Sequence, residues 1–190
     1  MKCTLTKHRN ELYLVVEKTG IMARNQQNIM EKYHLLNRPN RELTEKSEIN
    51  EILINGKYAV ISMCRNNEPY IITLSYGFDA EHNSLYFHCA PKGLKLDFIE
   101  SNKRVCATVI EDGGYVLGEC GHNYKTVVFW GDMKIVTDID EKKHGMTILL
   151  QHLENDADII KEKLIKSDDY YSKMEIMKLE IIQIHGKAGR

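Results

Sequence analysis

Apolar and polar residues alternate along several segments of the chain with the two-residue period of a β-strand. In the clearest segment, residues 84–89, Leu85, Phe87 and Cys89 occupy one side and Tyr86 and His88 the other. The other segments with strand character are 12–16, 58–64, 70–78, 104–111, 125–137 and 174–185. Turn-forming residues at 66–68 and 79–83 separate three of these segments, which predicts two consecutive hairpins.

A helical period replaces the alternation in five segments: 22–36, 44–55, 94–102, 138–154 and 157–166. Thr44 is the predicted N-cap of the second helix, and Asn55-Gly56 is its predicted end. The fourth helix begins at Asp138 or Asp140. Residues 113–121, which include four glycines, are predicted to form a loop.

The order of these elements indicates the fold class. About six strands with hairpin connections and helices at the flanks predict a mainly β, antiparallel α+β domain that resembles a barrel. A parallel doubly wound sheet would need strands that alternate with longer helices throughout. The chain also lacks the GxGxxG and GxxxxGK[ST] motifs of dinucleotide-binding and P-loop proteins.

Composition sets the domain organisation. The chain has 190 residues, enough for one domain with a small appendage, and 43% of them are hydrophobic, enough for a core. We divide it into an N-terminal extension, residues 1–36, and a β-barrel domain, residues 37–190. Whether the extension is a docking arm or a segment with little structural role stays open.

Charge and hydropathy exclude several classes of partner. The formal net charge is −1, and no long basic run is present, so nucleic-acid binding is not expected. No apolar run is long enough to span a membrane, and the N-terminus lacks the layout of a signal peptide. We therefore expect a cytoplasmic protein without membrane contact.

Cysteine usage argues against a disulfide framework or a structural zinc site. The five cysteines are an odd number, and no CxxC pair is present. Cys120-Gly121-His122 holds two residue types that bind metals, but no second pair lies nearby in the sequence, so we assign it to a loop. No metal site is predicted.

The loop that follows residues 84–89 contains the first candidate chemistry. Lys92, Gly93 and Lys95 lie where a helix begins, and a helix N-terminus favours anions such as phosphate. Lys95 is the first candidate for a direct phosphate contact, and Gly93 allows the backbone to approach closely. A solvated surface lysine is the alternative for either residue, and for Lys92 it carries equal weight.

Two segments in tandem, PYIITLSYG (Pro69–Gly77) and LYFHCAPKGLK (Leu85–Lys95), resemble the flavin-nucleotide-binding proteins of the pyridoxamine-phosphate-oxidase-like superfamily. The resemblance is closest to its nitroimidazole-resistance (Nim-type) branch and extends from about Arg38 onward. The chain departs from that pattern at four places: Thr73 replaces proline, Ser75 replaces asparagine, Cys89 replaces serine, and Leu94 precedes Lys95.

The resemblance implies an FMN-binding split β-barrel that forms a homodimer with FMN at the subunit interface. The segment NYKTVVFW, which contains Thr126, resembles the strand that the partner subunit presents to the flavin in that superfamily. The residues that the resemblance assigns to FMN binding are Thr73, Leu74, Ser75, His88, Cys89, Lys92, Gly93, Lys95 and Thr126. His88 is also the predicted catalytic residue, beside the flavin phosphate, the ribityl chain or the substrate; a structural histidine is the alternative.

The implied function is that of an NAD(P)H-dependent oxidoreductase acting on nitroaromatic or similar small acceptors, with the redox chemistry supplied by FMN. No Ser-His-Asp order or paired-carboxylate motif suggests a hydrolase. Two alternatives stay open. One is a haem protein of the same fold, with an axial ligand among His88, His122, His144, His152 and His185. The other is a non-catalytic flavin-binding module.

Overall fold

The computed structural model describes residues 4–8, 11–15 and 39–189, and the chain divides into two compact units, residues 1–40 and 41–190. In the first unit, β1 (Thr4–His8) pairs antiparallel with β2 (Glu11–Val15). The strand expected at 12–16 is therefore β2, which begins one residue earlier. The helix expected at 22–36 lies outside the described residues.

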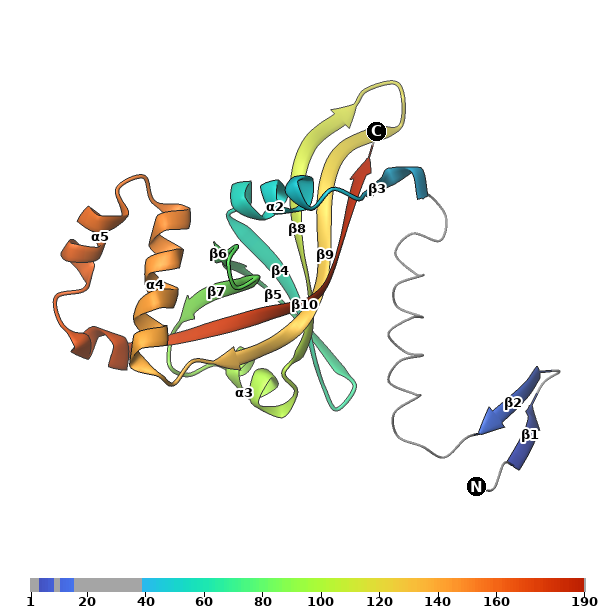
Figure 1. Cartoon of the computed structure of the whole chain (residues 1–190), viewed down its shortest axis with the longest axis horizontal. Helices are drawn as coiled ribbons and strands as arrows, with labels where there is room; N and C mark the ends of the chain where they lie inside the picture. Colours follow the sequence, from blue (N-terminus) through green and yellow to red (C-terminus); the bar gives the residue numbers. More distant parts are fainter. Residues whose placement is uncertain (1–3, 9–10, 16–38, 190) are drawn as a thin grey trace. The chain divides into compact units, whose positions relative to one another are not determined.

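The second unit is built on one antiparallel sheet of eight strands (Figure 1). The strand order is β5-β4-β8-β9-β10-β7-β6, and β3 pairs separately with β10. The strands are β3 (Glu42–Leu43), β4 (Tyr58–Arg65), β5 (Glu68–Ser75), β6 (Gly77–Asp79), β7 (Ser84–Cys89), β8 (Arg104–Val116), β9 (Gly121–Ile135) and β10 (Glu175–Gly189). The sheet thus has two strands more than the six expected, because β3 was missed and the segment 70–78 is divided.

The division of that segment makes the sheet a split barrel. β5 and β6 follow one another in sequence, yet they lie at opposite ends of the strand order. Only Tyr76 separates them, so the chain passes between the two edges of the curled sheet at a single residue. The Tyr76 side chain is fully buried, and its hydroxyl donates a hydrogen bond to the Leu53 carbonyl oxygen at 2.6 Å. The expected single strand at 70–78 is wrong for this reason, while the expected barrel-like antiparallel fold is confirmed.

The inward residues of the alternating strands fill the barrel with one apolar core, which two helices help to close. α2 (Lys46–Asn55) contributes Ile52 and Leu53, and α3 (Leu94–Ser101) contributes Leu96, Phe98 and Ile99. The main strand contributions are Ala59, Ile61, Met63, Leu85, Phe87, Val105, Ala107, Val109, Val127, Phe129, Met133, Met177 and Leu179.

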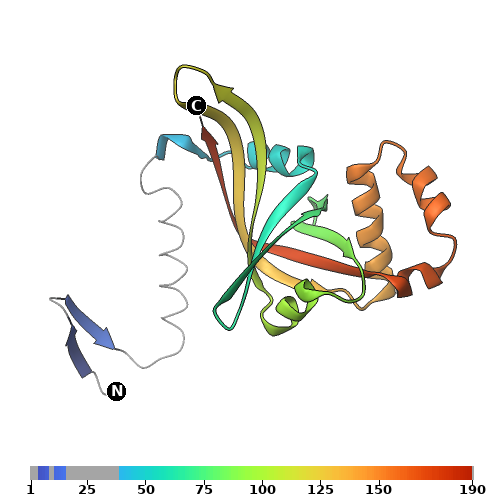
Figure 2. The ribbon, with the colours of Figure 1, turned by 180° about the vertical axis from the view of Figure 1, so that it is seen from behind.

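A second apolar cluster lies on the other face of β7 and β10, beneath α4 (Ile139–Leu153). Figure 2 shows α4 beside β7, with α5 (Ala157–Leu164) beyond it. α4 approaches the sheet closely because each side of the contact has a glycine: a Cβ on Gly145 of α4 would lie 2.5 Å from the Tyr86 ring, and one on Gly77 of β6 would lie 2.6 Å from the Leu149 backbone nitrogen. Two short 3-10 helices, Pro39–Arg41 and Asp168–Lys173, complete the described structure.

Several element ends differ from the expectations. Glu45, not Thr44, is the N-cap of α2, and no side-chain hydrogen bond caps that helix. Asp138 caps α4, accepting a hydrogen bond from the Glu141 N–H at 2.8 Å. Of the segment expected as a glycine-rich loop, 113–116 extend β8 and Gly121 begins β9, so only 117–120 form the turn of a long hairpin. The register of this hairpin shifts between Asp112 and Tyr115. No described helix has the length and apolar character needed to cross a membrane.

Candidate functional site

The outer face of β4, β5 and β8 is largely exposed in the single chain, and the outward residues of β9 are half-buried. Strand registers place Thr73, Val60, Thr108, Val128 and His185 in one row across β5, β4, β8, β9 and β10. Large apolar side chains lie on the same face, two positions from this row along their strands. Ile71 is 66% exposed, Tyr58 is 58% exposed and Ile110 is 56% exposed. A sheet face with apolar residues this open to water is typical of an interaction surface.

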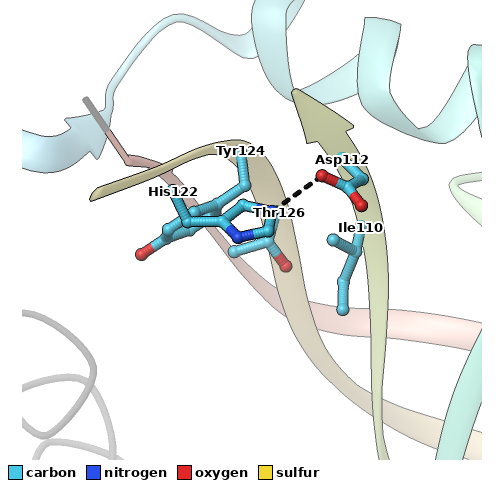
Figure 3. A pocket seen from close by; sticks show the side chains of 5 residues that line it. All are labelled: Ile110, Asp112, His122, Tyr124 and Thr126. Carbon is cyan, nitrogen blue, oxygen red and sulfur yellow. Dashed lines mark hydrogen bonds and ion pairs between the residues drawn. The ribbon is translucent and has the colours of Figure 1, made fainter. Parts of the chain in front are cut away.

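Thr126 borders a cavity of about 290 Å³ on this face (Figure 3). Ile110 and Asp112 line the cavity from β8, and His122, Tyr124 and Thr126 line it from β9. The Thr126 hydroxyl donates to the Val109 carbonyl oxygen at 3.0 Å and lies 3.0 Å from the Thr108 hydroxyl. These contacts hold the Thr126 side chain in one orientation at the wall of the cavity.

His122 and Asp112 form an exposed pair at the mouth of this cavity. The His122 Nε2 lies 2.8 Å from the Asp112 Oδ1, which also accepts the Gly114 N–H at 2.8 Å. The hydrogen bond with His122, with that from Gly114, lowers the pKa of Asp112 below its usual value. The pattern of residues placed His122 in a loop and among the possible haem ligands, but not beside Asp112. The expected strands end at 111 and begin again at 125, whereas β8 and β9 continue and pair beyond both limits.

The loop between β7 and α3 brings Gly93, Lys95 and Cys89 together. Gly93 is the N-cap of α3 and has φ of 155°, a conformation that favours glycine. A Cβ placed on Gly93 would lie 3.7 Å from the Lys95 Nζ, so the ammonium group folds back over the glycine. Burial raises the pKa of the Cys89 thiol, and the positive charge of Lys95 acts against that rise. The Cys89 sulfur lies 4.0 Å from the Met177 sulfur in the core.

The other predicted site residues have different surroundings. His88 and Lys92 are exposed, at the end of β7 and in the loop that follows. Thr73 and Ser75 are exposed on the outer face of β5, whereas the Leu74 side chain packs against the core. Since β5 ends the strand order, one side of its backbone is not paired within the described sheet.

One chain does not gather all the predicted residues into one pocket. Thr126 and Thr73 lie on strands with β4 and β8 between them, which at about 4.8 Å per strand separates them by about 14 Å. His88 pairs with Ile176 and Thr126 pairs with Lys187 along the same strand, β10. At about 3.3 Å per residue, those two positions are about 36 Å apart along β10.

The comparisons agree with the fold. The family model described as pyridoxamine 5'-phosphate oxidase matches residues 45–187. A search of curated proteins gives no significant match. Among solved structures, a candidate 5-nitroimidazole antibiotic resistance protein from Bacteroides thetaiotaomicron has a TM-score of 0.67 and 21% identity, over 78% of this chain and 86% of that chain.

Two further similar solved structures are those of proteins described as binding cofactors. A FAD-binding protein from Mesorhizobium loti has a TM-score of 0.56 and 19% identity, over 79% of this chain and 96% of that one. A FAD and haem binding protein from Mycobacterium smegmatis has a TM-score of 0.64 and 14% identity, over 79% of this chain and 74% of that one. At these identities the structural likeness establishes the split-barrel fold.

Proposed function

The chain belongs to the pyridoxamine 5'-phosphate oxidase family, and on that premise we propose that it is an FMN-binding, NAD(P)H-dependent oxidoreductase that works as a homodimer. Its substrates would be nitroaromatic or similar small electron acceptors. The observation that carries this proposal is the arrangement at the start of α3, where the Lys95 ammonium lies over Gly93.

This arrangement suits a flavin phosphate. The N-terminus of α3 offers backbone N–H groups and the positive end of the helix dipole, and Lys95 adds a full positive charge. Gly93 carries no side chain that would keep a phosphate from the backbone. Lys92, which is exposed, would add a weaker and more mobile charge.

The edge strand suits the other end of the cofactor. Alternate residues of β5 direct their backbone N–H and C=O groups away from β4. Within Thr73–Ser75 these outward groups would hydrogen-bond the pyrimidine edge of an isoalloxazine ring. The exposed His88 side chain would orient the ribityl–phosphate part or deliver a proton to a reduced acceptor. FMN, when bound, supplies the redox chemistry by accepting a hydride from the nicotinamide.

The proposal of a homodimer is supported by the distance between two parts of the predicted site within one chain. Thr126 of β9 pairs with the end of β10 that lies far from the β7–α3 loop that holds Lys95, so Thr126 contributes to that site only if a second subunit presents it. The exposed apolar face of β4, β5 and β8 would supply the contact area. The cavity lined by Thr126, Tyr124 and Ile110 would then face the flavin bound by the other protomer.

The first test is the absorption spectrum of the purified protein, followed by identification of any ligand released by heat. We expect a two-band flavin spectrum and release of FMN. Lys95→Glu should weaken FMN binding at least about tenfold, because it replaces a charge-assisted contact with a repulsion. Lys166→Glu is the matched control, since Lys166 is exposed after α5 and gives the same change in net charge.

Three results would contradict parts of this proposal. Equal FMN affinity in Lys95→Glu and Lys166→Glu would remove the phosphate site at α3. A flavin that neither NADH nor NADPH reduces under anaerobic conditions would favour the non-catalytic module. A colourless protein that does not take up added FMN would remove the enzyme proposal and leave the fold.

Haem binding is the second candidate, favoured by the structural likeness to the Mycobacterium smegmatis protein described as binding both FAD and haem. The exposed imidazole of His88 is available as an axial ligand. A Soret band in the purified protein that is lost in His88→Ala would establish this reading. A flavin spectrum without a Soret band would exclude it.

A further inference from the structure

Two histidines and one aspartate meet where α4 crosses the β6–β7 hairpin, and none of them is among the residues proposed to bind FMN. Asp79 is the last residue of β6, His82 lies in the turn, and His144 lies on α4. The Asp79 Oδ2 is 2.9 Å from the His82 Nδ1 and 2.8 Å from the His144 Nε2. All three potential ligand atoms lie within 4.8 Å of one another.

The carboxylate at the centre of this cluster is buried and hydrogen-bonded to both histidines. The Asp79 side chain is only 5% exposed. Both imidazoles are accessible from outside, at 55% and 43% exposure, so solvent reaches the open side of the cluster.

The three side chains are held in place by their surroundings. The His82 backbone N–H donates to the Asp79 Oδ1 at 3.1 Å, and the Ser84 hydroxyl donates to the His82 carbonyl oxygen at 2.9 Å. The His144 ring packs edge-on against Tyr86, with ring centroids 5.5 Å apart. Lys178, near the same tyrosine ring, is paired with Glu141 at 2.9 Å, which compensates its positive charge.

We propose that Asp79, His82 and His144 bind a divalent transition-metal ion of the zinc class. Two imidazoles and one carboxylate are ligands that suit Zn²⁺, Co²⁺ or Ni²⁺, whereas Mg²⁺ and Ca²⁺ prefer oxygen ligands alone. With metal–ligand bonds of about 2.0–2.1 Å, neighbouring ligand atoms lie about 2.9–3.4 Å apart, so the two distances from Asp79 to the histidines need only a small expansion. The two imidazole nitrogens lie within 4.8 Å of each other, and a modest rotation of the exposed rings would bring both onto the ion. Water would occupy the remaining positions on the exposed side.

The ion would link two parts of the chain that are distant in sequence. It would join the β6–β7 turn to α4 and so fasten the helix to the edge of the barrel. At free metal about a hundredfold above the dissociation constant, linkage predicts a rise in Tm of about 5–10 °C for a domain of this size. The site does not depend on FMN, so its test is independent of the proposed function.

The test is a Co²⁺ titration of the full chain, followed by visible absorption and by Tm with and without Zn²⁺. We expect one saturable site per chain, a Co²⁺ spectrum with nitrogen and oxygen ligands, and a higher Tm with Zn²⁺. Asp79→Asn, His82→Ala and His144→Ala should each weaken binding by about 100-fold or more, since even outer-shell changes cost about 10–100-fold. His122→Ala, which removes a two-residue Asp–His pair, is the control and should bind as the unmodified chain does.

Circular dichroism of each metal-free variant separates loss of a ligand from loss of the fold. If Asp79→Asn does not fold, the decision rests on the exposed His82, whose removal leaves the core intact. No saturable binding by the unmodified chain would overturn the proposal. So would equal Co²⁺ affinity in the folded His82→Ala and His144→Ala variants and the unmodified chain, because the eight histidines of the chain include other metal-binding groups.

Discussion

The two outer faces of the barrel differ in how far one chain completes them. On β7 and the first half of β10, α4 covers the sheet, and Tyr86 and Ile176 are almost wholly buried beneath it. On β4, β5 and β8, the corresponding outward residues Tyr58, Ile71 and Ile110 remain more than half exposed. The same alternation of residues therefore gives a half that α4 covers, on β7 and the first half of β10, and an open half, on β4, β5 and β8, whose outward side chains remain exposed.

The difference lies in the residues that face outward. The covered half has Gly77 where α4 approaches, opposite Gly145 on the helix itself, and a buried Asp79 that is satisfied by hydrogen bonds. The open half combines apolar residues with hydroxyl groups such as Thr73 and Thr108, which suits contact with a ligand or a second subunit. We infer that the covered half stabilises the fold, and that the open half adds the β5 edge and the homodimer contact to the proposed function.

The largest expected effect separates the two halves by stability. Ile176→Ala should lower the free energy of unfolding by about 2–5 kcal/mol, because it leaves a cavity beneath α4. Ile71→Ala should change it by no more than about 0.5 kcal/mol, because Ile71 is 66% exposed. Urea unfolding at two protein concentrations measures both and separates any contribution from association. Equal losses would mean that the two halves are not different in the way described.

A smaller effect concerns association rather than folding. Ile71→Lys should weaken the proposed homodimer at least about tenfold, because a charge would enter an apolar contact. Ile159→Lys on α5 is the matched control, since Ile159 is 64% exposed and lies outside the open face. Sedimentation velocity over a dilution series measures the dissociation constant. A protein that is monomeric before any substitution, or a dimer weakened equally by both changes, would move the interface elsewhere.

The sequence predicted some features of the barrel better than others. Alternation located the strands of the barrel because each inward side chain must reach the core, and the turn residues located both hairpins. Alternation could not show that Tyr76 interrupts its strand, because only the return of the chain to the far edge of the sheet requires that break. Nor could it show that the glycines after Asp112 continue a hairpin, because the pairing depends on a register shift.

The candidate sites divide in the same way. Lys95 and Gly93 are two residues apart, so their proximity could be inferred from the start of a helix, and the structure places them together. Asp79 and His144 belong to separate elements, and only the packing of α4 on β6 brings them within 2.8 Å. The pairing of Asp112 with His122 likewise depends on the long hairpin. Local motifs are therefore visible in the sequence, while clusters made by tertiary packing are not.

The smallest expected effect is a pH dependence of stability, which arises where His152 of α4 contacts Gly56 and Phe78. The His152 Nε2 donates to the Gly56 carbonyl oxygen at 2.6 Å, and its Nδ1 accepts the Phe78 N–H at 3.4 Å, which together require the neutral ring. Burial lowers the pKa of His152, and the positive charge of Lys57 adds to the decrease, although the bond to Gly56 acts against it.

The pKa of His152 in the folded state lies below the unfolded value of about 6.5, so this residue makes the folded protein more stable as the pH rises. The stabilising contribution of neutral His152 is complete above that unfolded pKa and is lost as the pH falls through the folded pKa. We therefore expect Tm to fall by a few degrees between about pH 7 and pH 5. His152→Gln should flatten this slope, whatever its Tm at neutral pH, whereas His88→Gln, a change at an exposed ring, should retain it. The same slope in both variants would show that α4 is fastened to the barrel by groups other than His152.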